Sequence, residues 1–256
     1  MNPSITTGKS RKIIIYLSLI ELKLRYRGTF FGFFWSVLEP LAQLGILYLV
    51  FSALRSADET FVIYLFSGLI MVHLFSRGTN QAMNSLINKK SIIVSLNIPK
   101  IIFPFSSLLT NLYMIGIEFV IFFLFIAILG VEISTMILLL PAIVFLLIVF
   151  TCGMALILSI VRLYFKDIQS IWGIVVVSLI FITPVFWNVN DLPQDISQIF
   201  LLNPLAVIME MGHEVILYQT IPSFEDAAYS VVTSFATLFV GWILFKKFER
   251  KIVEKL

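Results

Sequence analysis

The sequence predicts an all-α polytopic membrane protein with six transmembrane helices. Three observations lead to this prediction: 59% of the 256 residues are hydrophobic, only 13% are charged, and the mean hydropathy is +1.01. A soluble domain is closer to half apolar and a quarter charged. Lipid must therefore be the solvent for most of this chain.

Residues 1–32 are predicted to form a cytoplasmic amino terminus that contains an amphipathic interface helix. From Arg11 to Arg27, apolar residues recur at helical spacing among charged ones. This pattern is typical of a helix that lies along a membrane surface, either as an anchor or as a docking element for a cytoplasmic partner. The segment lacks the apolar core and small-residue cleavage site of a secretory signal.

A helix needs roughly 20 apolar residues to cross the hydrocarbon layer. Six segments approach or exceed this length, and they define a transmembrane domain over residues 33–245. The predicted spans are 33–54, 61–83, 101–129, 135–162, 170–187 and 228–245, and residues 246–256 form a basic cytoplasmic tail.

The region 190–224 is predicted to be an external re-entrant helical hairpin between the fifth and sixth spans. Its apolar stretch from Ile196 to Leu217 is interrupted by Asn203 and Pro204 and then carries polar residues. Proline breaks the helical hydrogen-bond ladder, and polar groups at this depth need burial in protein. A six-span count also keeps both basic ends of the chain on one side.

The distribution of basic residues predicts that both termini lie inside the cell. With six spans, all but Arg55 of the 18 Lys and Arg residues fall on one side of the membrane. The positive-inside rule assigns that side to the cytoplasm. The net charge of +3 therefore reflects topology, and no nucleic-acid partner is expected.

No catalytic site, metal site or bound cofactor is predicted for this chain. The sequence Gly8-Lys9-Ser10 matches the end of a phosphate-binding loop, but the required earlier glycine is Pro3. The Glu-x-x-His spacing of Glu210 and His213 would need a second copy to hold a di-metal centre. A single cysteine, Cys152, excludes an internal disulfide and a cysteine-based metal site.

Two acids, Glu39 and Glu118, lie inside predicted spans. A charge at the centre of an isolated span costs roughly 2.5 to 3.5 kcal/mol on insertion, so each carboxylate needs a polar neighbour. Three roles remain open for these residues: a structural hydrogen bond to a neighbouring span, the lining of a transport path, or a proton relay.

Several short motifs resemble one known family. The opening motifs are Glu-Leu-Lys-Leu-Arg-Tyr-Arg-Gly at 21–28, Phe-Phe-Gly-Phe-Phe-Trp at 30–35 and Leu-Glu-Pro-Leu at 38–41. Later ones are Tyr-Phe-Lys-Asp-Ile at 164–168, Phe-Ile-Thr-Pro-Val-Phe-Trp at 181–187 and Leu-Asn-Pro-Leu at 202–205. In this order they resemble the membrane subunit of bacterial type-2 ABC exporters for polysaccharides such as O-antigen, capsule and teichoic acid.

The resemblance implies a homodimer around a channel for a lipid-linked polysaccharide in the bacterial inner membrane. Two ABC ATPase subunits, which bind ATP and Mg, would supply the energy. The helix at Arg11 to Arg27 would sit on the ATPase, and the loop from Asn84 to Lys100 would contain a coupling helix. Residues placed at this contact, with phospholipid head groups as rival partners, are Arg25, Arg27, Lys89, Lys90, Lys166 and Asp167.

Aromatic side chains are predicted to line the channel, because flat rings let a sugar polymer slide without being held. The inner end would use Phe30, Phe31, Phe33, Phe34 and Trp35 together with Glu39, and the outer end Phe181, Phe186 and Trp187. The external gate would involve Pro184, as a hinge or a simple kink, together with Asn203 and Pro204.

Three other functions were compared with this one. A type-2 ABC permease for a drug or lipid would share the fold, since fold does not fix substrate. A self-contained secondary carrier would show paired broken helices in both halves of the chain, and only one interrupted region is present. A membrane-embedded enzyme would show a polar cluster at one interface, and no such cluster is found.

Overall fold

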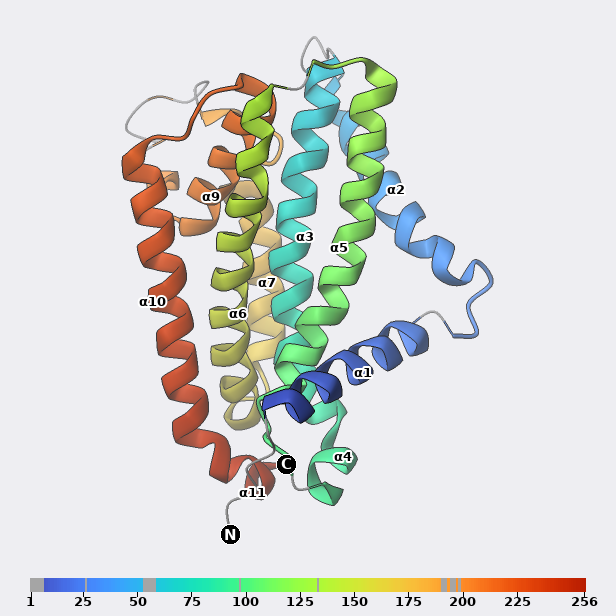
Figure 1. Ribbon diagram of the computed structural model, residues 1–256, viewed down its shortest axis with the longest axis vertical. Helices are drawn as coiled ribbons and strands as arrows, with labels where there is room; N and C mark the ends of the chain where they lie inside the picture. Colours follow the sequence, from blue (N-terminus) through green and yellow to red (C-terminus); the bar gives the residue numbers. More distant parts are fainter. Residues whose placement is uncertain are drawn as a thin grey trace.

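A computed structural model describes residues 7–25, 27–52, 59–96, 98–132, 134–189, 193, 197 and 199–256, with backbone alone at Thr7, Phe33 and Glu59. Within these ranges every regular element is helical, which confirms the all-α prediction (Figure 1). The elements are α1 (Thr7–Arg25), η1 (Gly32–Phe34), α2 (Trp35–Ser52), α3 (Glu59–Asn88), α4 (Lys90–Ser95), α5 (Ile102–Leu129), η2 (Thr135–Leu139), α6 (Leu140–Tyr164), α7 (Ile168–Ile182), α9 (Pro204–His213), η4 (Glu214–Tyr218), α10 (Phe224–Phe248), η5 (Glu249–Lys251) and α11 (Ile252–Lys255).

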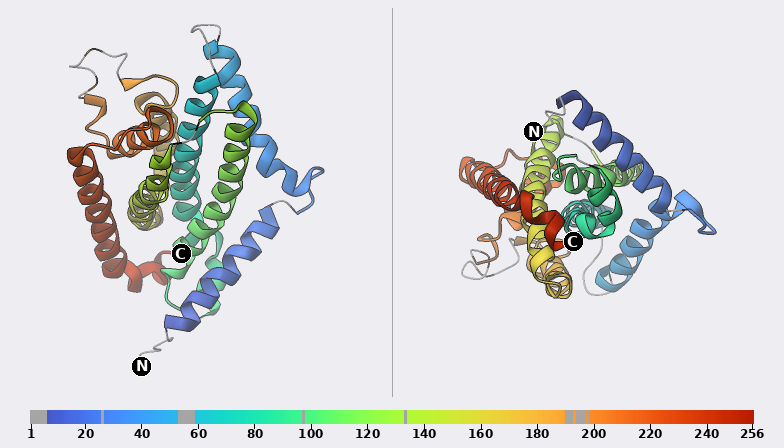
Figure 2. Two further views of the ribbon diagram at one scale, coloured as in Figure 1. Left: turned by 45° about the horizontal axis from the view of Figure 1, so that its top comes forward. Right: turned by 90° about the horizontal axis from the view of Figure 1, so that it is seen from below.

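The bundle is built around α3, which packs against α5 and α6 and is the most buried of the long helices. Its side chains Phe66, Ile70, Leu74 and Met83 are almost fully buried. Helix α2 leans away from the bundle, and α1 crosses the foot of α5 (Figures 1 and 2). The two N-terminal helices are therefore the least enclosed part of the molecule.

Five helical segments of the described chain are long and apolar enough to cross a membrane: α2, α3, α5, η2 with α6, and α10 with its C-terminal extension. The predicted fifth span at 170–187 is wrong about its end, because α7 stops at Ile182. Thr183 is extended, as expected for a residue that precedes proline. Pro184 therefore follows the helix and does not kink it.

The Asn203-Pro204 interruption is a helix start. The Asn203 side chain accepts a hydrogen bond from the Leu205 backbone N–H at 3.1 Å, and Pro204 occupies the first turn, where no N–H is needed. Helix α9 then packs between α3, α6 and α10, with Leu205 to Met209 almost fully buried. Most of residues 190–198, the other limb of the predicted hairpin, lie outside the described residues.

Helices α6 and α10 make the most extensive helix contact, and their backbones touch at two glycines. A Cβ atom at Gly241 would lie 2.5 Å from the carbonyl oxygen of Gly153. A Cβ atom at Gly153 would lie 2.5 Å from the backbone nitrogen of Leu238. Small residues permit this close approach, which is a common means of helix association in membranes.

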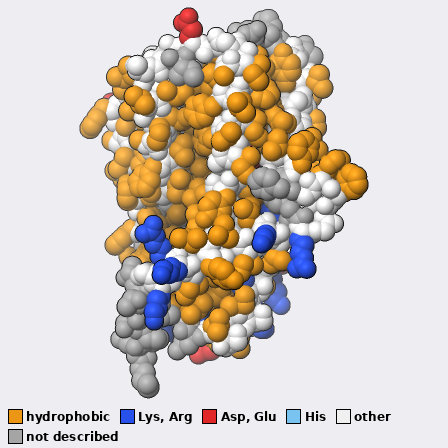
Figure 3. Space-filling model, turned by 45° about the vertical axis from the view of Figure 1, so that its right-hand side comes forward, with side chains coloured by type: hydrophobic (Ala, Val, Ile, Leu, Met, Phe, Trp, Pro, Cys, Tyr) orange, Lys and Arg blue, Asp and Glu red, His pale blue; other side chains and the backbone are white. Residues whose placement is uncertain are grey.

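One end of the bundle carries α1, α4 and α11 together (Figure 1). Helix α4 lies within the predicted loop from Asn84 to Lys100, and α3 continues to Asn88, beyond the predicted end of the second span. On the face in Figure 3, Lys and Arg side chains gather toward this end, whereas hydrophobic side chains cover the rest of the bundle. On this face the basic side chains therefore mark one end of the bundle's long axis.

Candidate functional site

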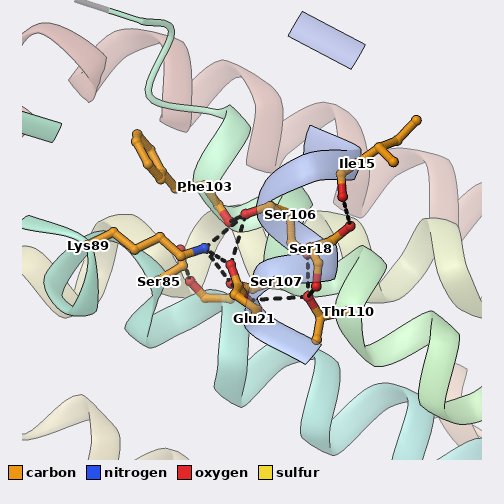
Figure 4. A network of polar contacts seen from close by, with 10 residues as sticks. Ile15, Ser18, Glu21, Ser85, Lys89, Phe103, Ser106, Ser107 and Thr110 are labelled. Carbon is orange, nitrogen blue, oxygen red and sulfur yellow. Dashed lines mark hydrogen bonds and ion pairs between the residues drawn. The ribbon is translucent and has the colours of Figure 1, made fainter. Parts of the chain in front are cut away.

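A polar cluster joins α1 to the corner between α3 and α4 and to α5 (Figure 4). The Lys89 ammonium forms an ion pair with Glu21 of α1 and donates to the Ser106 hydroxyl at 2.9 Å. The hydroxyl groups of Ser107 and Thr110 donate to the other Glu21 oxygen at 3.0 and 3.3 Å. One carboxylate on α1 is therefore held both from the corner between α3 and α4 and from α5.

Burial lowers the pKa of the Lys89 ammonium from 10.5 to about 8. Only 12% of this side chain is exposed, so the charge that was expected to face an ATPase faces the interior instead. Lys89 positions α1 and α4 relative to each other.

Helix α1 is expected to dock more firmly as the pH rises from about 8 to 10.5. A Lys89 side chain that undocking of α1 returned to water would have the usual lysine pKa of 10.5, whereas its pKa in the structure is about 8. The undocked state binds more protons in this window, so raising the pH favours docking. A spin label at the exposed Tyr16 would report the change as lower mobility. Replacing Lys89 with Met should abolish this dependence, and a wild-type protein with no change between pH 7 and 10 would contradict it.

The other predicted coupling residues occupy different environments at the same end. The Arg25 guanidinium reaches into the bundle and contacts Met114 of α5. Lys90 bonds to the Leu256 carbonyl at the carboxyl end, and Arg27 lines an apolar groove along α1. The side chains of Lys166 and Asp167, just before α7, are exposed. Lys166 accepts a hydrogen bond from Arg162 through its backbone carbonyl.

A second polar network lies within the membrane-spanning helices. Arg77 of α3 donates to Glu118 of α5 at 2.6 Å and to Glu39 of α2 at 3.3 Å. Only 1% of the Glu118 side chain is exposed, against 15% for Arg77 and 48% for Glu39. Glu118 therefore has the structural partner on a neighbouring span that was one of its three predicted roles. Arg77, assigned above to the cytoplasmic side, lies inside α3.

His73 extends this network across α3. Its Nδ1 lies 2.9 Å from Glu118 Oε2, and its Nε2 lies 2.7 Å from the side-chain oxygen of Gln43 on α2. His73 and Arg77 are one helical turn apart, so they present their polar groups to the same neighbours. Because α2 leans away from the bundle, these bonds are a main polar attachment of α2.

Two aromatic clusters lie at opposite ends of α2. At its start, Phe31 contacts the rings of Phe30, Phe34 and Trp35 at centroid distances of 5.0, 6.3 and 5.5 Å. Phe30 is 95% exposed, so this cluster is an open surface. The side chain of Phe33, predicted to join it, lies outside the described residues.

The second cluster is at the far end of α2. Phe186 stacks on Phe51 of α2 at 4.6 Å and contacts Phe181 at 5.6 Å. Trp187 contacts Phe200 at 5.1 Å, and its backbone carbonyl accepts a hydrogen bond from Tyr64 of α3 at 2.5 Å. The predicted outer aromatic residues thus come together beside the buried Pro184.

A cavity of about 350 Å³ opens near α9 and the start of α10. Glu210, Glu214 and Asp226 line it together with Tyr218 and Thr220. Within the described residues, no group of His, Cys, Asp and Glu side chains is arranged to hold a metal ion. These acidic groups lie on or next to α9, the helix that begins at the predicted gate residues, with Asn203 as its N-cap and Pro204 as its first residue.

The family model of the ABC-2 type transporters matches residues 14–217, which include the second half of α1, both polar networks and both aromatic clusters. The chain belongs to the ABC-2 type transporter family. The resemblance drawn from the short motifs is confirmed at the level of the family. In this ABC-2 family member, α1 lies at the start of the matched region and α10 lies beyond its end.

Named relatives match this ABC-2 chain over nearly its whole length. The O-antigen export system permease protein RfbA of Klebsiella pneumoniae is 26% identical over 252 residues, 95% of each chain. The polysialic acid transport protein KpsM of Escherichia coli is 24% identical and covers 93% of each chain. The capsule polysaccharide export inner-membrane protein BexB of Haemophilus influenzae is 23% identical, covering 94% of this chain and 92% of its own.

Sequence reasoning missed the residues that complete both polar networks. Gln43 and His73 carry polar groups inside apolar segments, and these groups were the available signal. Glu21 and Thr110 gave a weaker signal, because an acidic residue on an interface helix and a threonine within an apolar helix are both common. Their partnership depends on α1 crossing α5, which no local pattern indicates.

Proposed function

We propose that this chain is the membrane-spanning subunit of an ATP-driven ABC exporter that moves a lipid-linked polysaccharide across the bacterial inner membrane. The observation that carries the proposal is the near full-length match to relatives named as exporters of O-antigen, polysialic acid and capsule polysaccharide. The open aromatic cluster around Phe31 supports it, because sugar rings present apolar C–H faces to flat side chains.

The proposed topology has six spans, with both termini in the cytoplasm. Helix α7 is the fifth of these spans in chain order and would be added to the five long apolar helices. Its 15 residues give only about 22 Å of helix, so the chain after Ile182 would complete the crossing. The gathering of Lys and Arg side chains near α1 supports placing this end in the cytoplasm.

Two copies of the chain would pair around the channel, and two ABC ATPase subunits would dock below them. The docking surface would consist of α1 and α4, which lie at the same end and are joined through Glu21 and Lys89. ATP and Mg would bind to the ATPase subunits. In this arrangement the two aromatic clusters would line the inner and outer parts of the channel, and Pro184, Asn203 and Pro204 would lie near its external mouth.

Co-purification with the ATPase tests this function. We expect the detergent-solubilised chain to form a complex of two copies of each subunit, whose ATP turnover changes when a purified lipid-linked glycan is added. A stable complex that does not respond to any glycan would point to a permease for a drug or lipid. The absence of a complex would point to a self-contained carrier.

A further inference from the structure

An apolar groove runs along α6 and α10, beside the start of α5. Its volume is about 610 Å³, and its lining includes Phe105 of α5. The lining residues of α6 run from Phe145 to Cys152 and those of α10 from Phe235 to Trp242, so the groove extends about 10 Å along these helices. This length is shorter than the roughly 15 Å of hydrocarbon in one leaflet. The groove therefore lies within the reach of a lipid from a single leaflet.

The walls of this groove are aromatic rings, whereas its floor consists of smaller side chains. Phe145 and Phe239 project outward with 55% and 66% of their surface exposed, while Val149 is buried and Cys152 is half-buried between them. Close helix association in membranes uses small residues at the contact, so a second helix packed here would have to turn the rings aside. A flexible acyl chain can follow the hollow between the rings without moving them.

One end of the groove meets an ammonium group. Lys246 follows Trp242 by four residues on α10, and its Nζ atom lies 5.4 Å from the centroid of the Trp242 ring. The Lys246 side chain is 47% exposed and pairs with Glu249 at 3.2 Å. A lysine ammonium has three donors, so this pairing leaves donors for a further acceptor. The Trp242 ring is 45% exposed and stands where an indole suits the boundary between hydrocarbon and head groups.

Other basic side chains lie near the same end. Helix α1 crosses the foot of α5, and it begins near the foot of α6 (Figures 1 and 2). Its first turns carry Lys9, Arg11 and Lys12, which are all exposed, and the helix has no acidic residue before Glu21. A phosphate at this end would therefore meet positive charge from two helices. A zwitterionic head group would bring a cation of its own into that field, so an anionic lipid is favoured.

We propose that the groove between α5, α6 and α10 binds one anionic phospholipid, with an acyl chain between Phe145 and Phe239 and the phosphate at Lys246. The proposal goes beyond the export function and holds whichever polymer is moved. The proposed topology only assigns this lipid to the cytoplasmic leaflet. A phospholipid is chosen over a polyprenyl phosphate because the groove is about 10 Å long and would hold little of a polyprenyl chain.

Native mass spectrometry of the delipidated full-length chain tests the proposal. The probes are phosphatidylglycerol, which is anionic, and phosphatidylcholine, which is zwitterionic, with identical acyl chains. The first phosphatidylglycerol should bind at least about fivefold more tightly than the first phosphatidylcholine, which is the factor expected from one lysine at the membrane surface. Lys246→Gln should weaken the first phosphatidylglycerol about fivefold and leave phosphatidylcholine unchanged.

Lys247→Gln is the matched control for the head group. It removes the same charge from the next residue, but the Lys247 ammonium lies 5.9 Å from the ring of Phe248, which lines a different groove. Both lysines are exposed, so both variants should fold. Binding of phosphatidylglycerol should be unchanged in Lys247→Gln. Equal losses in the two variants would reduce the effect to general attraction by a basic surface and overturn the proposal.

A second pair of variants tests the acyl chain. Cys152→Phe adds a ring to the floor of the groove and should weaken the first binding of both lipids at least about fivefold, because several methylene groups lose their contact. Ile128→Phe adds a similar ring to a residue of α5 that is 80% exposed and does not line this groove, and it should change neither affinity. A Cys152→Phe chain with wild-type helix content and wild-type lipid affinities would overturn the proposal.

The two rival occupants have their own signatures. Cys152 is the single cysteine of the chain, so a short bifunctional thiol reagent that joined two wild-type chains would show that a second copy covers the groove. Tighter binding of a polyprenyl phosphate than of phosphatidylglycerol, lost in Lys246→Gln, would identify a sugar carrier as the occupant. Either result would overturn the assignment to a phospholipid.

Discussion

Replacing Arg77 with Met is expected to lower the free energy of unfolding by about 3–5 kcal/mol. The change leaves the Glu118 carboxylate buried without its guanidinium partner, and it also removes the contact to Glu39. Unfolding in mixed micelles with increasing SDS, followed by circular dichroism, would measure the loss. Helix α2 should also become more mobile, because Arg77 is one of its main polar attachments.

A double-mutant cycle provides the control for this prediction. Replacing Glu118 with Leu together with Arg77→Met removes both buried charges, so the double variant should be more stable than the Arg77→Met variant alone. His73 would retain its bond to Gln43 in both variants. Additive losses in the two single variants would show that the charges do not depend on each other.

Replacing Gly153 with Ala is expected to destabilise the bundle by about 3 kcal/mol. The new methyl group would meet the backbone of α10 at Thr237 and Leu238, both at 2.5 Å, and backbone atoms cannot rotate away as a side chain can. The two helices would have to separate along the most extensive helix contact in the bundle. The same SDS titration would measure the effect.

Gly116→Ala is the matched control, because Gly116 also lies inside a long apolar helix and a Cβ atom there meets nothing within 4 Å. That variant should be unchanged or slightly stabilised, since alanine favours the helix by about 1 kcal/mol. Equal losses at Gly153 and Gly116 would attribute the effect to glycine itself and refute the role of close helix approach.

The helical architecture was largely predictable because long apolar segments and helix caps are local signals. The predicted spans at 101–129 and 61–83 lie within or close to α5 and α3, and the interface helix appears as α1. The end of α7 was predicted too late, because the apolar residues continue through Phe186 although Thr183 has already left the helix. Hydropathy reports only how apolar the side chains are. The helix ends because the proline at 184 disfavours a helical backbone at Thr183, which hydropathy does not detect.

The candidate sites were harder to predict because they depend on contacts between distant residues. The family resemblance placed Lys89 at the ATPase contact, and only the crossing of α1 over α5 supplies Glu21 as its buried partner. Arg77 was counted with the other basic residues on the cytoplasmic side, and such a count does not show that its guanidinium pairs with the buried Glu118. Both pairings join residues that are distant in the sequence.

Helix α3 links the two ends of the molecule as one continuous rod. Its 30 residues contain no proline and extend for about 45 Å. At one end it meets Lys89 at the corner with α4. Toward the other end a Cβ atom at Gly68 would lie 3.1 Å from Val185 Cα, and the Tyr64 hydroxyl donates to the Trp187 carbonyl. Since no proline interrupts this helix, we expect a displacement of its end beside α4 to move the segment around Pro184 as well.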